Sequence, residues 1–210
     1  MASFLVYVFS RFCCWVYFRF YFNLSIVGRE NIPRRGGFII ASNHSSYFDP
    51  ILLGVSSPRL LYYLGKGSLF TGRVRRWLFR NLKVIPIRRD TQSPNALKKA
   101  IRILREGEPL VIFPEGTRAS AQALKEGKRG IGFLVSKTNV PVIPAYIKGS
   151  GVALPKGQKR PKRCPITVFI GKPMHMHIST NNSAMASDFY SNIAQHIMSH
   201  VQALMVHHES

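Results

Sequence analysis

Short apolar runs that suit buried strands recur along the chain, and segments with helical periodicity separate most of them. The predicted strands lie at residues 24–28, 38–41, 60–64, 84–87, 110–113, 142–147 and 167–170. Helical patterns cover residues 68–82, 94–106, 130–138 and 184–206. Apolar strands that alternate with helices favour a parallel sheet covered on both faces. The predicted fold class is therefore α/β, with a largely parallel or mixed sheet flanked by helices.

The N-terminal stretch differs from the rest of the chain. Residues 4–22 are apolar and rich in aromatics, but Arg11 and Arg19 interrupt them. Three placements are open: a helix in the membrane interface, a membrane span, and a helix docked in the core. Central charge disfavours a span, and arginines beside aromatics suit the interface. We predict a membrane-associating segment at residues 1–23, monotopic or peripheral, and one domain at residues 24–210, because 46% hydrophobic residues can build one core.

The charge balance predicts an anionic partner. Lysine and arginine number 30 against 9 acidic residues, a net charge of +21. Nucleic acid, an anionic lipid surface and a phosphorylated small molecule all fit such an excess. The sequence contains no recognisable nucleic-acid-binding module, so nucleic acid is not expected. The three cysteines form no CxxC pair, which favours a reducing compartment and the cytoplasmic face of a membrane.

Three polar motifs each follow a predicted strand: His44 with Asp49, then Arg89, then residues 115–118. Ligands of such sheets bind outside the carboxyl ends of the strands, so we expect the motifs to share one edge. A carboxylate beside an imidazole is one way to build a general base. The other interpretation is structural, with Asp49 as a helix N-cap and His44 bonded to backbone. Five helical positions are about 140° apart, so the chain must turn between the two residues.

The arginines suit a phosphate. Guanidinium groups bind phosphate in a bidentate manner, so Arg89 and Arg118 are candidates to hold a phosphomonoester. The alternative for each is a solvated basic surface. Glu115 either accepts a hydrogen bond from a substrate hydroxyl or pairs with Arg118, and Gly116 allows close backbone approach.

Four blocks of the sequence resemble those of the glycerophospholipid acyltransferases, closest to the 1-acylglycerol-3-phosphate acyltransferases. The blocks are NHSSYFDP at residues 43–50, VIPIRR at 84–89, FPEGTR at 113–118 and VPVIP at 140–144. The resemblance covers residues 24–175. The chain departs from the family where Lys83 stands in place of a glycine and at residues 66–70, both near the expected substrate groove.

The resemblance implies acyl transfer from a thioester, acyl-CoA or acyl carrier protein, to the hydroxyl of 1-acylglycerol-3-phosphate. His44 would act as the general base and Asp49 would orient it. Loop amides near residues 44–50 would steady the oxyanion. The acceptor would lie against five residues: Arg89, Glu115, Gly116, Thr117 and Arg118.

The expected partners are a lysophospholipid acceptor, the thioester donor and an anionic membrane surface, with no cofactor and no metal. His196 and His200, four positions apart, are interpreted as a solvated helix face. The alternatives are an acyltransferase acting on glycerol-3-phosphate or another lysophospholipid, and a non-catalytic basic protein that binds anionic membrane or nucleic acid.

Overall fold

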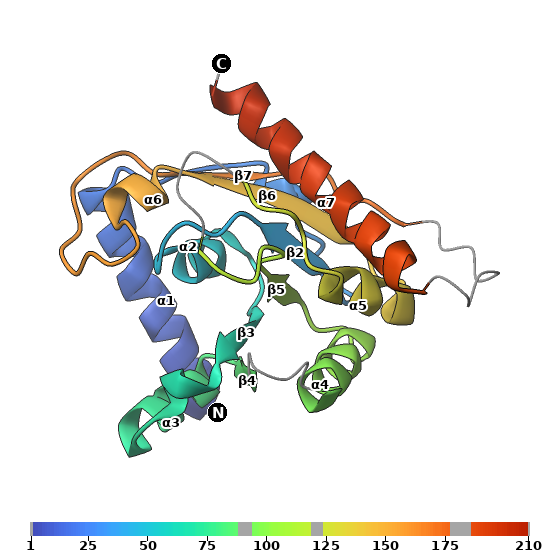
Figure 1. Cartoon of the computed structure of the whole chain (residues 1–210). Helices are drawn as coiled ribbons and strands as arrows, with labels where there is room; N and C mark the ends of the chain where they lie inside the picture. Colours follow the sequence, from blue (N-terminus) through green and yellow to red (C-terminus); the bar gives the residue numbers. More distant parts are fainter. Residues whose placement is uncertain (1, 88–93, 119–123, 177–185, 210) are drawn as a thin grey trace.

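The computed structural model describes residues 2–87, 94–118, 124–176 and 186–209 and has a central sheet between two helical layers (Figure 1). The strands are β1 (Ser25–Val27), β2 (Ile39–Ser42), β3 (Tyr62–Lys66), β4 (Val84–Ile87), β5 (Leu110–Ile112), β6 (Val142–Lys148) and β7 (Thr167–Ile170). The helices are α1 (Ala2–Tyr21), α2 (Asp49–Ser56), α3 (Arg73–Asn81), α4 (Pro94–Arg105), α5 (Gly130–Thr138), α6 (Ser150–Ala153) and α7 (Ala186–Glu209). Two 3₁₀ turns, Arg29–Asn31 and Gly67–Phe70, complete the described elements.

The sheet is mostly parallel. Its strand order is β1-β7-β6-β2-β5-β3-β4, and among these strands β6 and β7 pair in the antiparallel direction. Because β1 runs parallel to β7, these two strands oppose the direction of the other five. The predicted α/β class with a largely parallel or mixed sheet is confirmed.

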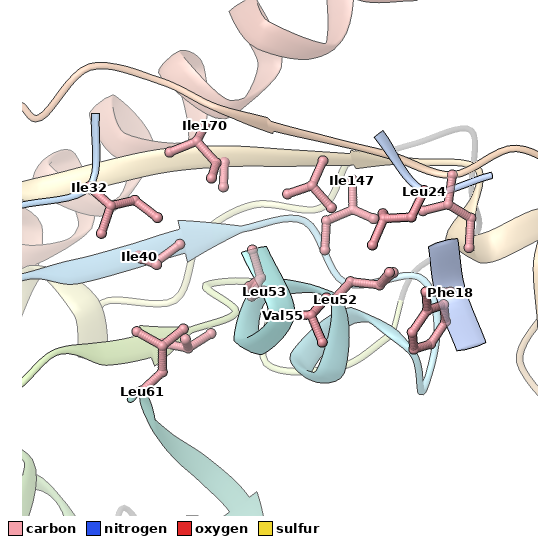
Figure 2. Close-up of a cluster of buried hydrophobic side chains, with 14 of the residues drawn as sticks. Phe18, Leu24, Ile32, Ile40, Leu52, Leu53, Val55, Leu61, Ile147 and Ile170 are labelled. Carbon is pink, nitrogen blue, oxygen red and sulfur yellow. The ribbon is translucent and has the colours of Figure 1, made fainter. Parts of the chain in front are cut away.

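The central strand β2 is buried on both faces, as its continuous apolar sequence requires. Ile39 and Ala41 face α4, α5 and α7, whereas Phe38 and Ile40 face the opposite layer. On that second face α2 inserts Leu52, and α1 adds Phe18, as Figure 2 shows. The period-2 alternation thus divides the apolar core into two clusters.

Helix α1 packs on α2 and touches α3, and its side chains divide between protein and solvent. Tyr7 and Phe18 are buried, whereas Phe9 and Phe20 are 70% and 73% exposed. Arg11 is partly buried and interacts with Tyr7 and Tyr63, and desolvation lowers the pKa of its guanidinium. Within residues 2–87, 94–118, 124–176 and 186–209, no helix combines the length and apolar character that a membrane crossing needs. The division of the chain at residue 23 stays a prediction.

Two local predictions were wrong. The helix expected over residues 68–82 is split into the 3₁₀ turn Gly67–Phe70 and α3, because Gly72 adopts a left-handed φ of +79° between them. In addition, none of the residues of α3 itself is buried, so the apolar side of this basic helix does not pack into the core. The segment 148–165 is rich in glycine, proline and basic residues, a composition that predicts a loop, yet it contains the short helix α6.

Candidate active site

Two of the three predicted motifs meet at the carboxyl edge of the sheet. His44 lies just beyond β2, and Glu115 lies just beyond its parallel neighbour β5. The backbone N–H of His44 donates to Oε1 of Glu115 at 2.9 Å. Arg89, the second predicted motif, lies outside the described residues. The common edge is therefore confirmed for the first and third blocks.

His44 and Asp49 form a hydrogen-bonded pair. Nδ1 of His44 lies 2.8 Å from Oδ2 of Asp49, and since a carboxylate can only accept, Nδ1 carries the proton. The imidazole stacks on the Phe113 ring with the centroids 4.2 Å apart. The His44 side chain is 17% exposed. Within the described part of the chain, no hydrogen bond engages its Nε2. The ring is thus fixed on one side and has a basic nitrogen available on the other.

The alternative interpretation of Asp49 as a helix N-cap was wrong. Asp49 is the first helical residue of α2, and Phe48 occupies the cap position. The fully buried carboxylate is directed back into the preceding loop. Its Oδ2 accepts the backbone N–H groups of Ser45 and Ser46, each at 2.7 Å, in addition to the imidazole. Asp49 therefore organises the loop that carries His44, as well as pairing with His44 itself.

Glu115 uses both carboxylate oxygens on backbone. Oε1 accepts from His44, and Oε2 accepts from the N–H of Lys125 at 3.2 Å. Burial raises the pKa of Glu115, and the two backbone donors offset part of that rise. No ion pair joins Glu115 to Arg118 in the described part of the chain, so that expectation is not met. In this conformation Glu115 ties the His44 loop to the segment after β5.

Arg118 lies over an aromatic ring. Its guanidinium carbon is 3.6 Å from the centroid of Tyr47, a residue that the sequence analysis did not single out. Nη1 of Arg118 is buried and lacks a hydrogen-bond partner among the described residues. Gly116, two positions earlier, has a φ of +69°, a conformation that glycine adopts without strain. Thr117 between them is half-buried. A cation that is desolvated without an acceptor is suited to an anionic ligand.

The end of β6 and the segment after it support the same loop from the other side. The Asn43 side chain donates to the Ile147 carbonyl at 3.1 Å and accepts the Ile147 N–H at 2.8 Å. The Ser46 hydroxyl donates to the Leu154 carbonyl, and Ser150 donates to Oδ1 of Asp49 at 2.6 Å. Sequence analysis missed these contacts, although Ser150 follows a strand end just as His44 and Glu115 do.

Four of the loop amides that were expected to steady an oxyanion are already engaged. The N–H groups of Ser45 and Ser46 bind Asp49, that of His44 binds Glu115, and that of Phe48 binds the Ser46 hydroxyl. None of these four donors binds an oxyanion unless its present bond breaks. At these four positions the expectation is not met, because two carboxylates and the Ser46 hydroxyl already accept the N–H groups.

Comparison with known proteins places the chain in a family. The protein family described as Acyltransferase matches residues 23–148. A 1-acyl-sn-glycerol-3-phosphate acyltransferase of Bacillus subtilis is 31% identical over 153 residues, covering 72% of this chain and 74% of that protein. A chloroplastic 1-acyl-sn-glycerol-3-phosphate acyltransferase of Arabidopsis thaliana is 30% identical over 159 residues, which are 74% of this chain but 44% of that protein.

The fold has a counterpart among solved structures. The crystal structure of the 1-acyl-sn-glycerophosphate acyltransferase PlsC of Thermotoga maritima superposes with a TM-score of 0.70 at 24% identity. The match covers 96% of this chain and 80% of that one. It supports the arrangement of the sheet and its helices. The family match over residues 23–148 and the Bacillus relative lead to one assignment: this chain belongs to the acyltransferase family and is an O-acyltransferase.

Proposed function

We propose that the chain transfers an acyl group from a thioester, acyl-CoA or acyl carrier protein, to the free hydroxyl of 1-acylglycerol-3-phosphate. The product is phosphatidic acid. The observation that carries this proposal is the His44–Asp49 pair, 2.8 Å apart at the sheet edge, with Nε2 of the imidazole available to a ligand. The names of the Bacillus and Arabidopsis relatives support the choice of acceptor.

In the proposed reaction Nε2 of His44 removes the proton of the acceptor hydroxyl as its oxygen attacks the thioester carbonyl. The tetrahedral intermediate collapses, the C–S bond breaks, and the imidazolium returns the proton to the departing thiolate. Asp49 holds the Nδ1–H and stabilises the transient positive charge of the ring. Because a thioester is already activated, the step needs no acyl-enzyme.

Arg118 is the residue that we assign to the acceptor phosphate within the described part of the chain, with Arg89 as a second candidate outside it. The buried Nη1 of Arg118 lacks a hydrogen-bond partner among the described residues, and the Tyr47 ring lies against one side of the guanidinium group. A phosphate oxygen would satisfy this donor. Gly116 and Thr117 would contact the phosphate or the glycerol, whereas Glu115 would act by holding the His44 backbone.

The test is thioester-dependent acylation of 1-acylglycerol-3-phosphate on anionic vesicles by wild type, His44→Ala and His200→Ala. His200 lies exposed on α7 and serves as the matched control. We expect a loss of about 10²–10⁴-fold for His44→Ala and none for the control. Full activity of a folded His44→Ala protein contradicts the general-base assignment. Activity of wild type only with glycerol-3-phosphate or another lysophospholipid contradicts the proposed acceptor.

We also propose that the enzyme works on the surface of an anionic membrane and contacts it through α1 and α3. The outer side of α1 carries the exposed Phe9, Phe12 and Phe20, and the adjacent α3 exposes Trp77 among four arginines. Aromatic side chains at the acyl boundary with cations at the phosphates are typical of interfacial helices. The N-terminus lies beside α3 in Figure 1, so both helices belong to one region of the molecule.

Vesicle sedimentation tests this placement. Phe9→Asp removes one exposed apolar contact and adds a negative charge, so binding to anionic vesicles should weaken about 10- to 100-fold. Val206→Asp makes the same change at an exposed residue of α7, across the sheet from α1, and should bind as wild type does. Equal binding of the two variants contradicts a membrane contact through α1.

A further inference from the structure

Ser150 is a buried polar residue that none of the four sequence blocks contains. It is the first residue of α6, lies beyond the stretch that the acyltransferase family matches, and is fully buried. Its hydroxyl lies 2.6 Å from Oδ1 of Asp49, although the two residues are 101 positions apart in the chain. A short hydrogen bond to a buried carboxylate at the candidate active site needs a physical account.

The two oxygens of Asp49 have different partners. Oδ2 accepts three N–H groups, those of the His44 imidazole and of the Ser45 and Ser46 backbone. Within the described residues, Oδ1 accepts from Ser150 alone. A buried carboxylate requires hydrogen bonds to stabilise its charge. Among the described residues, the Ser150 hydroxyl is the donor to Oδ1.

The direction of the hydrogen bonds in this cluster follows from their chemistry. A serine hydroxyl has one proton, and the carboxylate can only accept, so the Ser150 proton points to Asp49. The Ser45 hydroxyl, 3.1 Å from that of Ser150, must then donate to it. A single chain of donors runs from Ser45 through Ser150 to Asp49, and Asp49 in turn holds the proton-bearing Nδ1 of His44.

The backbone around Ser150 is built to hold it there. Gly149 turns the chain from β6 into α6 with a φ of +87°, and a Cβ at this position would lie 2.2 Å from the Pro165 carbonyl oxygen. The carbonyl of Leu154, just past α6, accepts the Ser46 hydroxyl at 3.0 Å. The short helix therefore contacts the His44 loop at both of its ends.

We propose that Ser150 is a positioning residue for the acyl transfer, acting on His44 through Asp49; this inference rests on the proposed function. The hydroxyl fixes the rotation of the carboxylate, so that Oδ2 stays directed at Nδ1. It also neutralises part of the carboxylate charge, so that without this hydroxyl Asp49 would attract a positively charged imidazole ring more strongly. Ser150 does not touch the substrate in this account.

The test compares Ser150→Ala, Ser150→Thr and Ser56→Ala. Ser56 is also fully buried, but its hydroxyl donates to the Leu52 carbonyl within α2, away from Asp49. Loss of one hydrogen bond to a charged group predicts that Ser150→Ala lowers kcat about 10- to 100-fold with KM unchanged. The acidic limb of its pH–rate profile should move to higher pH. Ser150→Thr, which keeps the hydroxyl, should have the kcat and the acidic limb of wild type. Ser56→Ala should leave kcat and the acidic limb unchanged.

The position of the acidic limb distinguishes a specific role from a general loss of packing. Within the described part of the chain, the charged groups in contact with His44 are Asp49 and Glu115, with Lys125 next to Glu115, and Glu115 keeps its partners in every variant. A folded Ser150→Ala protein with wild-type kcat and an unmoved limb overturns the proposal. So does a loss of kcat that Ser56→Ala reproduces without a shift of the limb.

If wild type acylates no acceptor, the proposed function fails and the Ser150 inference is still decided by NMR. The His44 ring resonance, followed against pH, should titrate at higher pH in Ser150→Ala and at the wild-type pH in Ser150→Thr. Identical titration curves in all three proteins overturn the inference independently of any substrate.

Discussion

Replacing Asp49 by Asn separates the charge of this side chain from its hydrogen bonds. The Oδ2 position faces three N–H donors, whereas the Oδ1 position faces one hydroxyl. An amide oxygen at the Oδ2 position keeps all three bonds, and its NH₂ group can donate to Ser150, whose proton then turns to Ser45. The opposite orientation would place NH₂ against three donors. Asp49→Asn should therefore retain the loop and leave the proton of His44 on Nδ1.

The expected effects on rate and stability differ in size. A carboxylate and an imidazolium about 4 Å apart attract by about 4 kcal/mol at an effective dielectric constant of about 20. The amide dipole retains part of this, so kcat should fall about 10²–10³-fold, with the free energy of unfolding within about 1 kcal/mol of wild type. Asp49→Ala instead leaves the two buried amides of Ser45 and Ser46 without acceptors. At about 1–3 kcal/mol each, it should destabilise the fold by about 2–6 kcal/mol.

The assay pairs kcat on anionic vesicles with urea unfolding of the same three proteins. The expected pattern is an Asn variant that is stable and slow and an Ala variant that is both unstable and slow. Two results would refute the reasoning. An Asn variant as unstable as the Ala variant means that the hydrogen bonds are wrongly assigned. An Asn variant within about threefold of the wild-type kcat means that the charge contributes little.

Three further predictions concern other parts of the molecule. Burial raises the pKa of Glu115 above its ordinary value of 4.5, so the folded state holds this proton more tightly and stability should fall as pH rises between the two values. Urea unfolding at several pH values should show that Glu115→Gln removes this fall in stability, whereas the exposed Glu126→Gln keeps it. The same dependence of stability on pH in wild type and both variants would contradict the prediction. Gly132→Ala places a Cβ 2.1 Å from the Tyr190 carbonyl oxygen and should destabilise the protein by about 1–3 kcal/mol, whereas Gly130→Ala, with nothing within 4 Å, should not. Equal melting of these two variants would refute the close packing of α5 on α7. Tyr47→Ala removes the ring under Arg118 and should raise KM for the phosphorylated acceptor about 2- to 30-fold, while kcat stays unchanged. An unchanged KM would exclude Tyr47 from holding Arg118.

The sequence predicted those features that depend on local periodicity and on strand ends. The bounds of α5 and β7 match the predicted segments, because apolar spacing alone defines a helix and a strand there. The turn between His44 and Asp49 followed from helical geometry, and their pairing is observed. The shared edge of the His44 and Glu115 motifs followed from the polarity of parallel strands.

Features that depend on contacts distant in sequence could not be predicted in this way. Helix α6 lies in a segment rich in glycine, proline and basic residues, and its first residue is held by Asp49 rather than by local propensity. The partners of Glu115 are backbone amides, which no side-chain pattern reveals. The position of Asp49 could not be predicted for the same reason. Its carboxylate accepts N–H groups of the preceding loop and does not cap α2, so Asp49 is the first helical residue.

The supports of the His44 loop have a consequence for the order of folding. His44 and Asp49 are neighbours in sequence, but the contacts that hold them, Asn43 to Ile147, Asp49 to Ser150 and Ser46 to Leu154, span 104, 101 and 108 positions. Pairings of such long range form late, because a large loop must close before they contribute. A nascent chain that ends before β6 therefore lacks these supports. On refolding, catalytic activity should return after helical structure has recovered, as one of the last properties of the native state to appear.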